Sequence, residues 1–473
     1  PQKAIVCAGF VAGRFVTEGD SMGESIKQDV CKQWVERDKK VIAPCQHLSY
    51  FPLAVDRAKD STVVDTDGNE FIDFLTSASS LNLGSCNEHI TAGIQEQLAK
   101  CTQYTAAYTY SPATIEYAER LCSVFPGRPA EDVRIAFGNC GSDCNDAAVK
   151  FARAYTGRRK IITFINAYHG STYGSIALSC VTTRMASKMG PFMGDIYHFP
   201  FYGSEAPDMP AEWYVKEIQE AFDTYLPAEE VAAVIIEPVQ GDGGLNLAND
   251  KFMHALYDLC KKHGILFISE EVQQAFWRDG HWFGIECFDG IVPDGIIMGK
   301  SVGASLTLGA FMARKDIMES LPAPAHLFTL GGNAIACAAG CAAFDYYQTD
   351  EFQGILKRNE RVMLELLEQT MADHPNTIGF IRGVGMSRGL AVVKKGEDGS
   401  MEADTTGTFK IVYRSYELGL LMISVADNIL RIQPPLNITE EELRRGFAIA
   451  NRAISEYEAG EISDDVLVNQ AGW

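Results

Sequence analysis

Two short stretches of this sequence carry residues suited to covalent and phosphate chemistry. Lys300 follows directly after the apolar run 295-GIIMG-299 and lies among small residues. A lysine is rarely buried unless its amine is needed in the neutral form as a nucleophile, for example toward a carbonyl group. Upstream, a second apolar run ends in a glycine-rich turn, and a helical pattern starts at Ser142. Gly141 and Ser142 would offer backbone N–H groups and a hydroxyl to a phosphate at the positive end of that helix.

Each of these features also has a purely structural interpretation. Ser142 is suited to be the N-cap of a helix that follows a glycine turn, and an isolated lysine at a strand end is most often on the surface. Glu270 and Glu271 close the apolar run 265-ILFIS-269. An acidic pair in this place is either solvated or the partner of a buried cation.

The order of the motifs along the chain separates these interpretations. After the phosphate motif come 168-YHGSTYG-174, 236-IEPVQGDGG-244, 270-EEVQ-273, Lys300 and 326-HLFTLGGNAIACAAG-340. This order closely resembles the class III aminotransferase family of pyridoxal-phosphate enzymes, which have the aspartate aminotransferase type of fold. The resemblance covers most of the chain, from 62-TVVDTDGNEFIDF-74 to 429-ILRIQPPLNI-438.

The resemblance implies cofactor-binding roles for residues in these motifs. Lys300 matches the lysine that forms a Schiff base with the cofactor and shuttles the Cα proton. Gly141 and Ser142 match the phosphate site. Thr329 matches a threonine that reaches the phosphate of the neighbouring subunit, so the active site would be completed across a homodimer, alone or within a dimer of dimers.

Four further residues match positions around the cofactor ring. Tyr168 matches the aromatic residue that stacks on one face, Val272 packs on the other, and Gln273 lies near the ring hydroxyl. Glu270 replaces the usual aspartate whose charge keeps the ring nitrogen protonated. Glu270 is one methylene longer than aspartate, so the resemblance leaves open how strongly the cofactor ring can accept electrons from the substrate Cα. The segment 276-FWRDG-280 also departs from the family's usual Gly-Arg-Thr-Gly turn.

Longer strings are more similar to one branch of the family, the amino-acid racemases. That branch contains the isoleucine 2-epimerases and the α-amino-ε-caprolactam racemases. The strings are 77-SASSLNLG-84, 138-GNCGSDCND-146, 149-VKFARAYTGR-158, 322-PAPAHLFTLGGN-333 and 428-NILRIQPPL-436. The resemblance favours racemisation over transamination.

One acidic position bears on the choice of reaction. Aminotransferases of this family commonly carry glutamate where this chain has Asp242, and that glutamate pairs with an arginine matching Arg431. We expect the shorter Asp242 to lie free of Arg431 and to face the substrate Cα opposite Lys300. Two bases on opposite faces would exchange the proton and invert the configuration. The alternative is ordinary sequence drift at this position.

Three residues are expected to bind substrate. Arg431 is a candidate for the substrate carboxylate, with a salt bridge at a strand end as the alternative. Ser79 and Tyr108 are suggested by the N-terminal motifs as residues near the entrance, together with Tyr104.

The sequence therefore predicts a racemase or 2-epimerase that acts on a neutral amino acid, with an aliphatic side chain favoured. Lys300 and Asp242 would be its two bases, and pyridoxal 5'-phosphate its cofactor. The first alternative is an aminotransferase that passes an amino group to a 2-oxo acid. The second is a catalytically impaired homologue that still binds the cofactor.

These residues must be positioned by a large α/β domain. Short apolar runs alternate with helical patterns over the middle of the chain, which predicts a mostly parallel sheet covered by helices on both faces. The runs are 133–137, 160–165, 231–238, 265–269 and 295–299; the helical patterns are 142–157, 211–226 and 250–264.

A smaller α+β domain is expected to follow. Its elements are a helix at 354–373, strands at 379–393 and near 429–435, and a polar turn at 394–407. The Asp-Gly signal within 62–74 predicts a hairpin that packs on the same domain. We expect domain limits of 22–80 for the N-terminal segment, 81–335 for the large domain and 336–473 for the small one. Residues 1–21 are expected to be disordered or foreign to the native protein.

Composition excludes several other classes of protein. Among 473 residues, 62 acidic and 41 basic side chains give a net charge of −21, which disfavours nucleic acid as a partner. No apolar run is long enough to span a membrane, and we expect no signal peptide. The 13 cysteines lack CxxC pairs, which favours reduced thiols in the cytoplasm and no metal site. Cys140 and Cys144 are expected to be buried thiols beside the phosphate site, where oxidation would impair cofactor binding.

Overall fold

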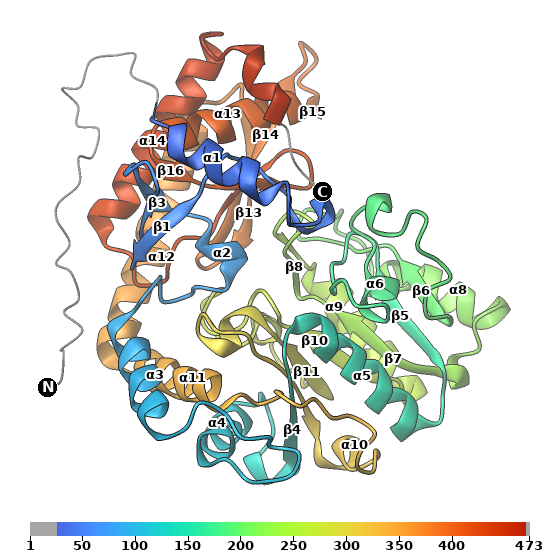
Figure 1. Cartoon of the computed structure of the whole chain (residues 1–473). Helices are drawn as coiled ribbons and strands as arrows, with labels where there is room; N and C mark the ends of the chain where they lie inside the picture. Colours follow the sequence, from blue (N-terminus) through green and yellow to red (C-terminus); the bar gives the residue numbers. More distant parts are fainter. Residues whose placement is uncertain (1–25, 470–473) are drawn as a thin grey trace, which may run out of the picture.

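A seven-stranded sheet forms the centre of the computed structural model, which describes residues 26–469 (Figure 1). Strand β12 runs antiparallel to both its neighbours, and the other pairs along the sheet from β11 to β6 are parallel. The predicted mostly parallel sheet is confirmed. In spatial order the strands are β4 (Val133–Gly138), β12 (Gly309–Arg314), β11 (Gly295–Met298), β10 (Leu266–Glu270), β7 (Val231–Ile236), β5 (Lys160–Phe164) and β6 (Ile196–Phe199).

Helices cover both faces of this sheet. Along β7 and β10 every residue is buried, as expected for strands that are apolar throughout. Alternate residues point to opposite faces, so Ile235 packs in the core formed with α5 (Gly141–Thr156). Val234 packs instead in the core formed with α9 (Asp250–His263).

Three strands and two helical segments differ from the expectation. Neither β6 nor β12 was predicted: β6 is short and contains His198 and Tyr197, and β12 is rich in glycine and alanine and lacks β-branched residues. The helical pattern at 211–226 breaks at Val215 into α7 (Ala211–Tyr214) and α8 (Lys216–Thr224). The predicted turn at 394–407 contains β15 (Met401–Ala403) and the start of α13.

The C-terminal part forms a second sheet. Its main path is β13–β14–β18–β17, and β15 pairs with β14. The strands are β13 (Ile378–Val384), β14 (Ser387–Lys395), β17 (Ile423–Val425) and β18 (Ile429–Ile432). The long helices of this part are α12 (Asp350–Asp373), α13 (Thr405–Glu417) and α14 (Glu440–Glu458).

The predicted hairpin within 62–74 is present. It consists of β2 (Thr62–Asp65) and β3 (Glu70–Asp73), and β1 (Val55–Lys59) extends it. Strand β3 pairs in parallel with β16 (Leu420–Leu421), so an N-terminal and a C-terminal segment share one sheet. The domain limits themselves stay predictions, and residues 1–21 lie outside the described part.

The remaining α-helices and strands of the described residues are α1 (Asp29–Asp38), α2 (Thr76–Ser79), α3 (Glu88–Lys100), α4 (Pro112–Ser123), α6 (Ser175–Leu178), β8 (Val239–Gln240), β9 (Asn246–Leu247), α10 (Lys315–Met318) and α11 (Ala334–Tyr347). Within residues 26–469, no helix combines the length and apolar character that a membrane crossing requires.

Candidate active site

A cavity of 190 Å³ lies where three neighbouring parallel strands end. Glu237 follows β7, Glu270 is the last residue of β10, and Lys300 comes two residues after β11. The carboxyl ends of parallel strands are the usual place for a ligand in such a sheet. Eight residues predicted for the site line this cavity: Gly141, Ser142, Tyr168, Asp242, Glu270, Val272, Gln273 and Lys300.

The predicted phosphate site lies at the start of α5. The helix begins at Gly141, and Cys140 is its N-cap residue. The Asp143 carboxylate accepts the backbone N–H groups of Asn139 (2.8 Å) and Cys140 (3.0 Å). The interpretation of Ser142 as the N-cap is therefore wrong. Its hydroxyl accepts the backbone N–H of Ser171 instead.

Three glycines let the segments around this site pack closely together. A Cβ atom on Gly141 would lie 2.8 Å from a Val272 methyl group, and one on Gly170 would lie 2.2 Å from the Ser142 hydroxyl. On Gly299 it would lie 2.8 Å from the backbone nitrogen of Gly141. Larger residues at these positions would clash with their neighbours, so the three glycines form a cradle of closely packed backbone around the N-terminus of α5.

Lys300 has an unusual backbone and an altered acidity. Its φ of 45° lies in the left-handed region, a costly conformation for a residue with a side chain. Burial lowers the pKa of its ammonium, and the nearby Asp242 charge opposes this shift. The lowered pKa favours the neutral amine, which is the form that acts as a nucleophile or a base.

Glu237 holds two neighbouring segments in place. Its carboxylate accepts the backbone N–H of Tyr168 (2.9 Å) and of Gly241 (3.0 Å). Burial raises its pKa well above the ordinary range, and the charge of Glu270 adds to the effect. No role for Glu237 was predicted from the sequence, although an acid directly after a fully apolar strand is a signal that could have indicated one.

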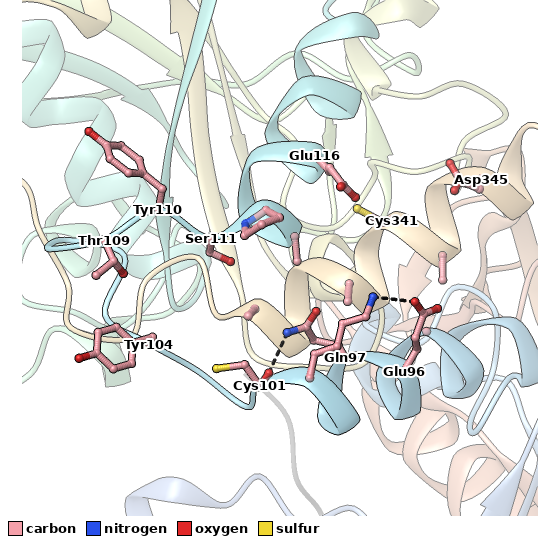
Figure 2. Close-up of a pocket in the computed structure, with 17 residues that line it drawn as sticks. Glu96, Gln97, Cys101, Tyr104, Thr109, Tyr110, Ser111, Glu116, Cys341 and Asp345 are labelled. Carbon is pink, nitrogen blue, oxygen red and sulfur yellow. Dashed lines mark hydrogen bonds and ion pairs between the residues drawn. The ribbon is translucent and has the colours of Figure 1, made fainter.

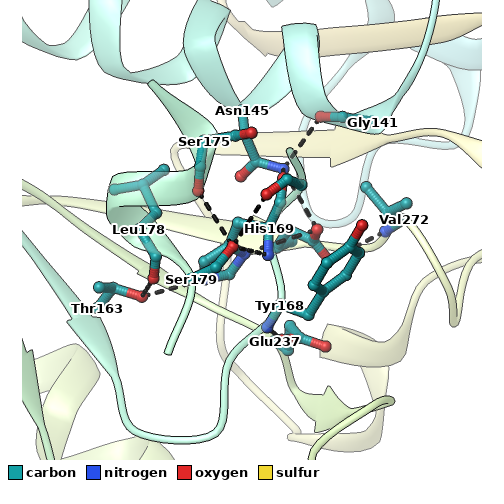
Figure 3. Close-up of polar contacts among 12 residues, drawn as sticks. Gly141, Asn145, Thr163, Tyr168, His169, Ser175, Leu178, Ser179, Glu237 and Val272 are labelled. Carbon is teal, nitrogen blue, oxygen red and sulfur yellow. Dashed lines mark hydrogen bonds and ion pairs between the residues drawn. The ribbon is translucent and has the colours of Figure 1, made fainter. Parts of the chain in front are cut away.

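Glu270 has a buried histidine as its neighbour. Glu270 Oε1 lies 3.6 Å from His169 Nδ1 and 3.3 Å from Asn145 Nδ2. The other ring nitrogen of His169 lies 3.0 Å from the Thr163 hydroxyl (Figure 3), whereas Nδ1 has no hydrogen-bond partner among the described residues. Neither His169 nor Asn145 was predicted from the sequence.

Asp242 lies beside Arg431, contrary to the expectation. Arg431 Nη1 donates to Asp242 Oδ1 at 3.1 Å, and both side chains are buried. The prediction that Asp242 lies free of Arg431 is therefore wrong, because β18 brings Arg431 within reach of the shorter acid. Burial lowers the pKa of the Arg431 guanidinium, against the opposing charge of Asp242.

Arg431 does not itself line the cavity, and neither do four other predicted residues. Ser79 is buried and donates its hydroxyl to Gln433 Oε1 at 2.6 Å. Tyr108 is 85% exposed, and Thr329 is exposed in the segment before α11. Tyr104 lines a separate pocket of 510 Å³ among α3, α4 and α11 (Figure 2).

The segment that carries Ser79 is strained. Thr76, Ser77, Ala78 and Ser79 have φ values of 48°, 47°, 58° and 64°. A left-handed turn of non-glycine residues costs about 1–2 kcal/mol per residue, so other contacts must hold it. The Asp73 carboxylate accepts the backbone N–H of Thr76 at 2.7 Å.

Cys140 and Glu271, both beside the site, have surroundings that the sequence did not predict. Cys144 is buried, and burial raises its thiol pKa well above the ordinary range, whereas Cys140 is exposed and lines the cavity. The expectation of two buried thiols is thus right for Cys144 alone. Glu271 accepts the backbone N–H groups of Gly284 (2.7 Å) and Ile285 (2.9 Å), and burial raises its pKa to about 8.

Comparison with known proteins shows the family of the chain. The model of the class-III aminotransferase family matches residues 44–454. The chain is 36% identical to isoleucine 2-epimerase of Lentilactobacillus buchneri, over 94% of this chain and 100% of the relative. It is 34% identical to leucine/methionine racemase of Thermococcus litoralis, over 93% of this chain and 99% of the relative.

A solved structure with the same fold carries the cofactor. Ornithine aminotransferase from Toxoplasma gondii, described with partial occupancy of PLP at its active site, superposes with a TM-score of 0.78 and 25% identity. The superposition covers 91% of this chain and 96% of that chain.

The cavity fits pyridoxal phosphate. The glycine cradle at the N-terminus of α5 suits the phosphate, and the amine of Lys300 suits the aldehyde. The carboxylate of Glu270 suits a positively charged ring nitrogen, and the unpartnered Nδ1 of His169 lies beside it. Pyridoxal 5'-phosphate is the cofactor of this fold. The chain belongs to the class III aminotransferase family of pyridoxal-phosphate-dependent enzymes.

Proposed function

We propose that this protein is an amino-acid racemase or 2-epimerase that inverts Cα of a neutral amino acid, with aliphatic side chains preferred. The observation that carries the proposal is the presence of Lys300 and Asp242 in the walls of one cavity. Relatives named isoleucine 2-epimerase and leucine/methionine racemase, both aligned over nearly the whole chain, support the same reaction and the same kind of substrate.

In this proposal two side chains move the Cα proton. Bound pyridoxal phosphate supplies an electron sink for negative charge that develops at Cα. Lys300 Nζ accepts or returns the proton on one face of the substrate, and the carboxylate of Asp242 does so on the other. Exchange between two faces inverts the configuration and needs no second substrate.

The contact with Arg431 is compatible with this role for Asp242. The hydrogen bond uses Oδ1 of the carboxylate, which leaves Oδ2 for the proton of the substrate. Arg431 Nε and Nη2 have no hydrogen-bond partner among residues 26–469. We propose that these nitrogens attract the substrate carboxylate and so bring Cα between the two bases.

The other residues of the cavity would hold the cofactor. Gly141 and Ser142 would bind the phosphate. Tyr168 and Val272 would enclose the ring, and Glu270 would face its nitrogen. His169, which lies beside Glu270, would reduce the effect that the longer glutamate side chain has on the charge of the cofactor's ring nitrogen.

We further propose that the working unit is a homodimer, in which Thr329 of a second copy completes the phosphate site. The exposure of Thr329 supports this role, because in the single chain its side chain is available to a partner. A reducing, cytoplasmic setting is proposed as well, since Cys140 is a free, exposed thiol at the cavity.

One observation favours an aminotransferase instead. The ion pair between Asp242 and Arg431 resembles the glutamate–arginine pair expected in aminotransferases of this family. An acid held in this pair would shape the substrate pocket and take no proton. A catalytically impaired homologue is the remaining alternative, and it would bind pyridoxal phosphate without turning over either enantiomer.

Chiral chromatography separates these functions. One enantiomer of isoleucine, leucine or methionine is incubated with the enzyme and pyridoxal phosphate in the absence of any 2-oxo acid. A racemase produces the epimer or the opposite enantiomer under these conditions. Turnover that begins only after a 2-oxo acid is added identifies an aminotransferase and contradicts the proposal.

A further inference from the structure

The amide of Gln273 is packed tightly at the edge of the cofactor cavity. Gln273 is buried and lines the cavity. A Cβ atom on Gly241 would lie 2.2 Å from Gln273 Oε1 and 2.6 Å from Nε2. The amide therefore lies flat against the Gly241 backbone, and any larger residue at position 241 would displace it.

A second glutamine contacts this amide from the C-terminal part of the chain. Gln433 follows β18 directly, and its side chain is fully buried. Gln433 Nε2 donates to Gln273 Oε1 at 3.3 Å and to the Ser387 hydroxyl at 2.8 Å. Gln433 Oε1 accepts the Ser79 hydroxyl at 2.6 Å. Both amide hydrogens of Gln433 are thus used, and its oxygen is bonded as well.

These contacts determine how the Gln273 amide is oriented. A reversed Gln433 amide would require Ser79, Ser387 and Gln273 all to exchange donor and acceptor roles at once. Because Gln273 Oε1 is held by Gln433, its NH₂ group is left to face the cavity. An NH₂ group there donates to an anionic oxygen, such as the ring hydroxyl oxygen of pyridoxal phosphate in its ionised form.

We propose that Gln433 is a positioning residue that orients the Gln273 amide so that it donates a hydrogen bond to the cofactor's ring oxygen. Gln433 does not touch the cavity itself. The proposal rests on cofactor binding in this cavity and is independent of whether the enzyme racemises or transaminates.

The strained turn at Thr76–Ser79 belongs to the same arrangement. Thr76 donates its hydroxyl to the backbone carbonyl of Gln433 at 2.8 Å, and Ser79 bonds the side-chain oxygen of the same residue. The left-handed turn therefore fixes Gln433 through two hydrogen bonds, one to its backbone and one to its side chain. This role explains why Ser79 is buried although it does not line the cavity.

The test compares Gln433→Glu with Gln353→Glu in the full-length enzyme loaded with pyridoxal phosphate. Gln353 undergoes the same chemical change at a remote site on α12, where its amide donates to the Tyr347 carbonyl. A glutamate at position 433 accepts where the glutamine donated, so the Gln273 amide must reverse and turn its oxygen toward the ring. The readout is the pH midpoint of the cofactor's visible absorbance.

We expect Gln433→Glu to raise this midpoint by about one pH unit, the size of one lost hydrogen bond to a charged oxygen. Gln353→Glu should leave it unchanged. Ser387→Ala removes one acceptor of Gln433 with a smaller disturbance, and it should shift the midpoint in the same direction by less. Thermal unfolding of each variant without cofactor identifies any folding defect.

An unchanged midpoint in folded, cofactor-loaded Gln433→Glu and Ser387→Ala would overturn the proposal. A loss of thermal stability without any spectral shift would do the same, because it would make Gln433 a packing residue. Failure of the racemase assignment would leave the expected spectral shift in place, so the two proposals are tested separately.

Discussion

The guanidinium of Arg431 lies 3.1 Å from the carboxylate of Asp242, although 189 residues separate them in the chain. Asp242 lines the cofactor cavity. Arg431 lies on β18 and contacts the Asp242 carboxylate from there. Both side chains are buried, so each charge depends on the other for compensation. The candidate catalytic acid is thus held by the same residue that is proposed to attract the substrate carboxylate.

Removal of Arg431 alone should destabilise the protein more than removal of the whole pair. Arg431→Met leaves the Asp242 charge buried without a partner, which costs about 3–5 kcal/mol. The double variant Arg431→Met/Asp242→Asn removes both charges and should recover most of that loss. Thermal unfolding of the four proteins without cofactor measures the coupling. Equal destabilisation in the single and double variants would show that the ion pair is energetically unimportant.

Replacement of Lys300 should abolish covalent attachment of the cofactor. The wild-type enzyme, reduced with borohydride after loading, should carry the pyridoxyl group on the peptide that contains Lys300. Lys300→Ala should show no such modified peptide in mass spectrometry and should lose activity by about a thousandfold or more. Lys262→Ala, on an exposed face of α9, serves as the matched control. Attachment at another lysine of the wild-type enzyme would contradict the assignment.

The buried Glu271 should make stability depend on pH. Burial raises its pKa from 4.5 to about 8, so between these values the folded chain holds a proton that the unfolded chain has lost. The contribution of Glu271 to the free energy of unfolding is therefore complete below pH 4.5, decreases as the pH rises from there, and is lost once the pH has passed 8. Between pH 5 and pH 8 the Tm of Glu271→Gln should therefore rise relative to the Tm of the wild type, with both proteins measured without cofactor. The exposed Glu229→Gln should show no such trend. A constant difference for Glu271→Gln would rule out its titration.

Two inactive variants should restore activity when their subunits are mixed. Lys300→Ala lacks the covalent lysine, and Thr329→Glu places a negative charge against the phosphate bound by the neighbouring subunit. In a mixed dimer one of the two sites has neither defect. Equal amounts of the two variants, exchanged at random, should therefore regain about a quarter of wild-type activity. No recovery after confirmed subunit exchange would show that Thr329 acts within its own chain, and full activity of Thr329→Glu alone would show that Thr329 has no part in the site.

Local patterns predicted much of the cavity from the sequence. Lys300, Gly141 and Ser142 were found because each stands next to an apolar strand or a helix start, and such junctions leave a signal over a few residues. Glu270 was found in the same way, at the end of an apolar run. The order of the motifs then identified the family, which implied roles for Asp242, Tyr168, Val272 and Gln273.

Contacts between distant segments could not be predicted in this way. The pairing of Asp242 with Arg431 depends on how β18 lies against the large domain, and no local pattern reports that distance. The left-handed turn at Thr76–Ser79 contains no glycine, so the usual signal for such a backbone is missing. Ser79 was therefore expected at the substrate, whereas its hydroxyl is used by Gln433.

Hydrogen exchange in heavy water tests the central claim most directly, namely that Lys300 and Asp242 act on opposite faces of Cα. Each enantiomer is incubated separately in D₂O with pyridoxal phosphate and no 2-oxo acid, using wild-type enzyme and Asp242→Asn. The wild type should place deuterium at Cα of both enantiomers and invert both. Asp242→Asn should bind the cofactor as tightly but lose inversion by about 10²–10⁴-fold, while Lys300 still exchanges the Cα hydrogen of one enantiomer. Inversion by Asp242→Asn at the wild-type rate, or an equal loss of cofactor binding and inversion, would contradict the two-base account.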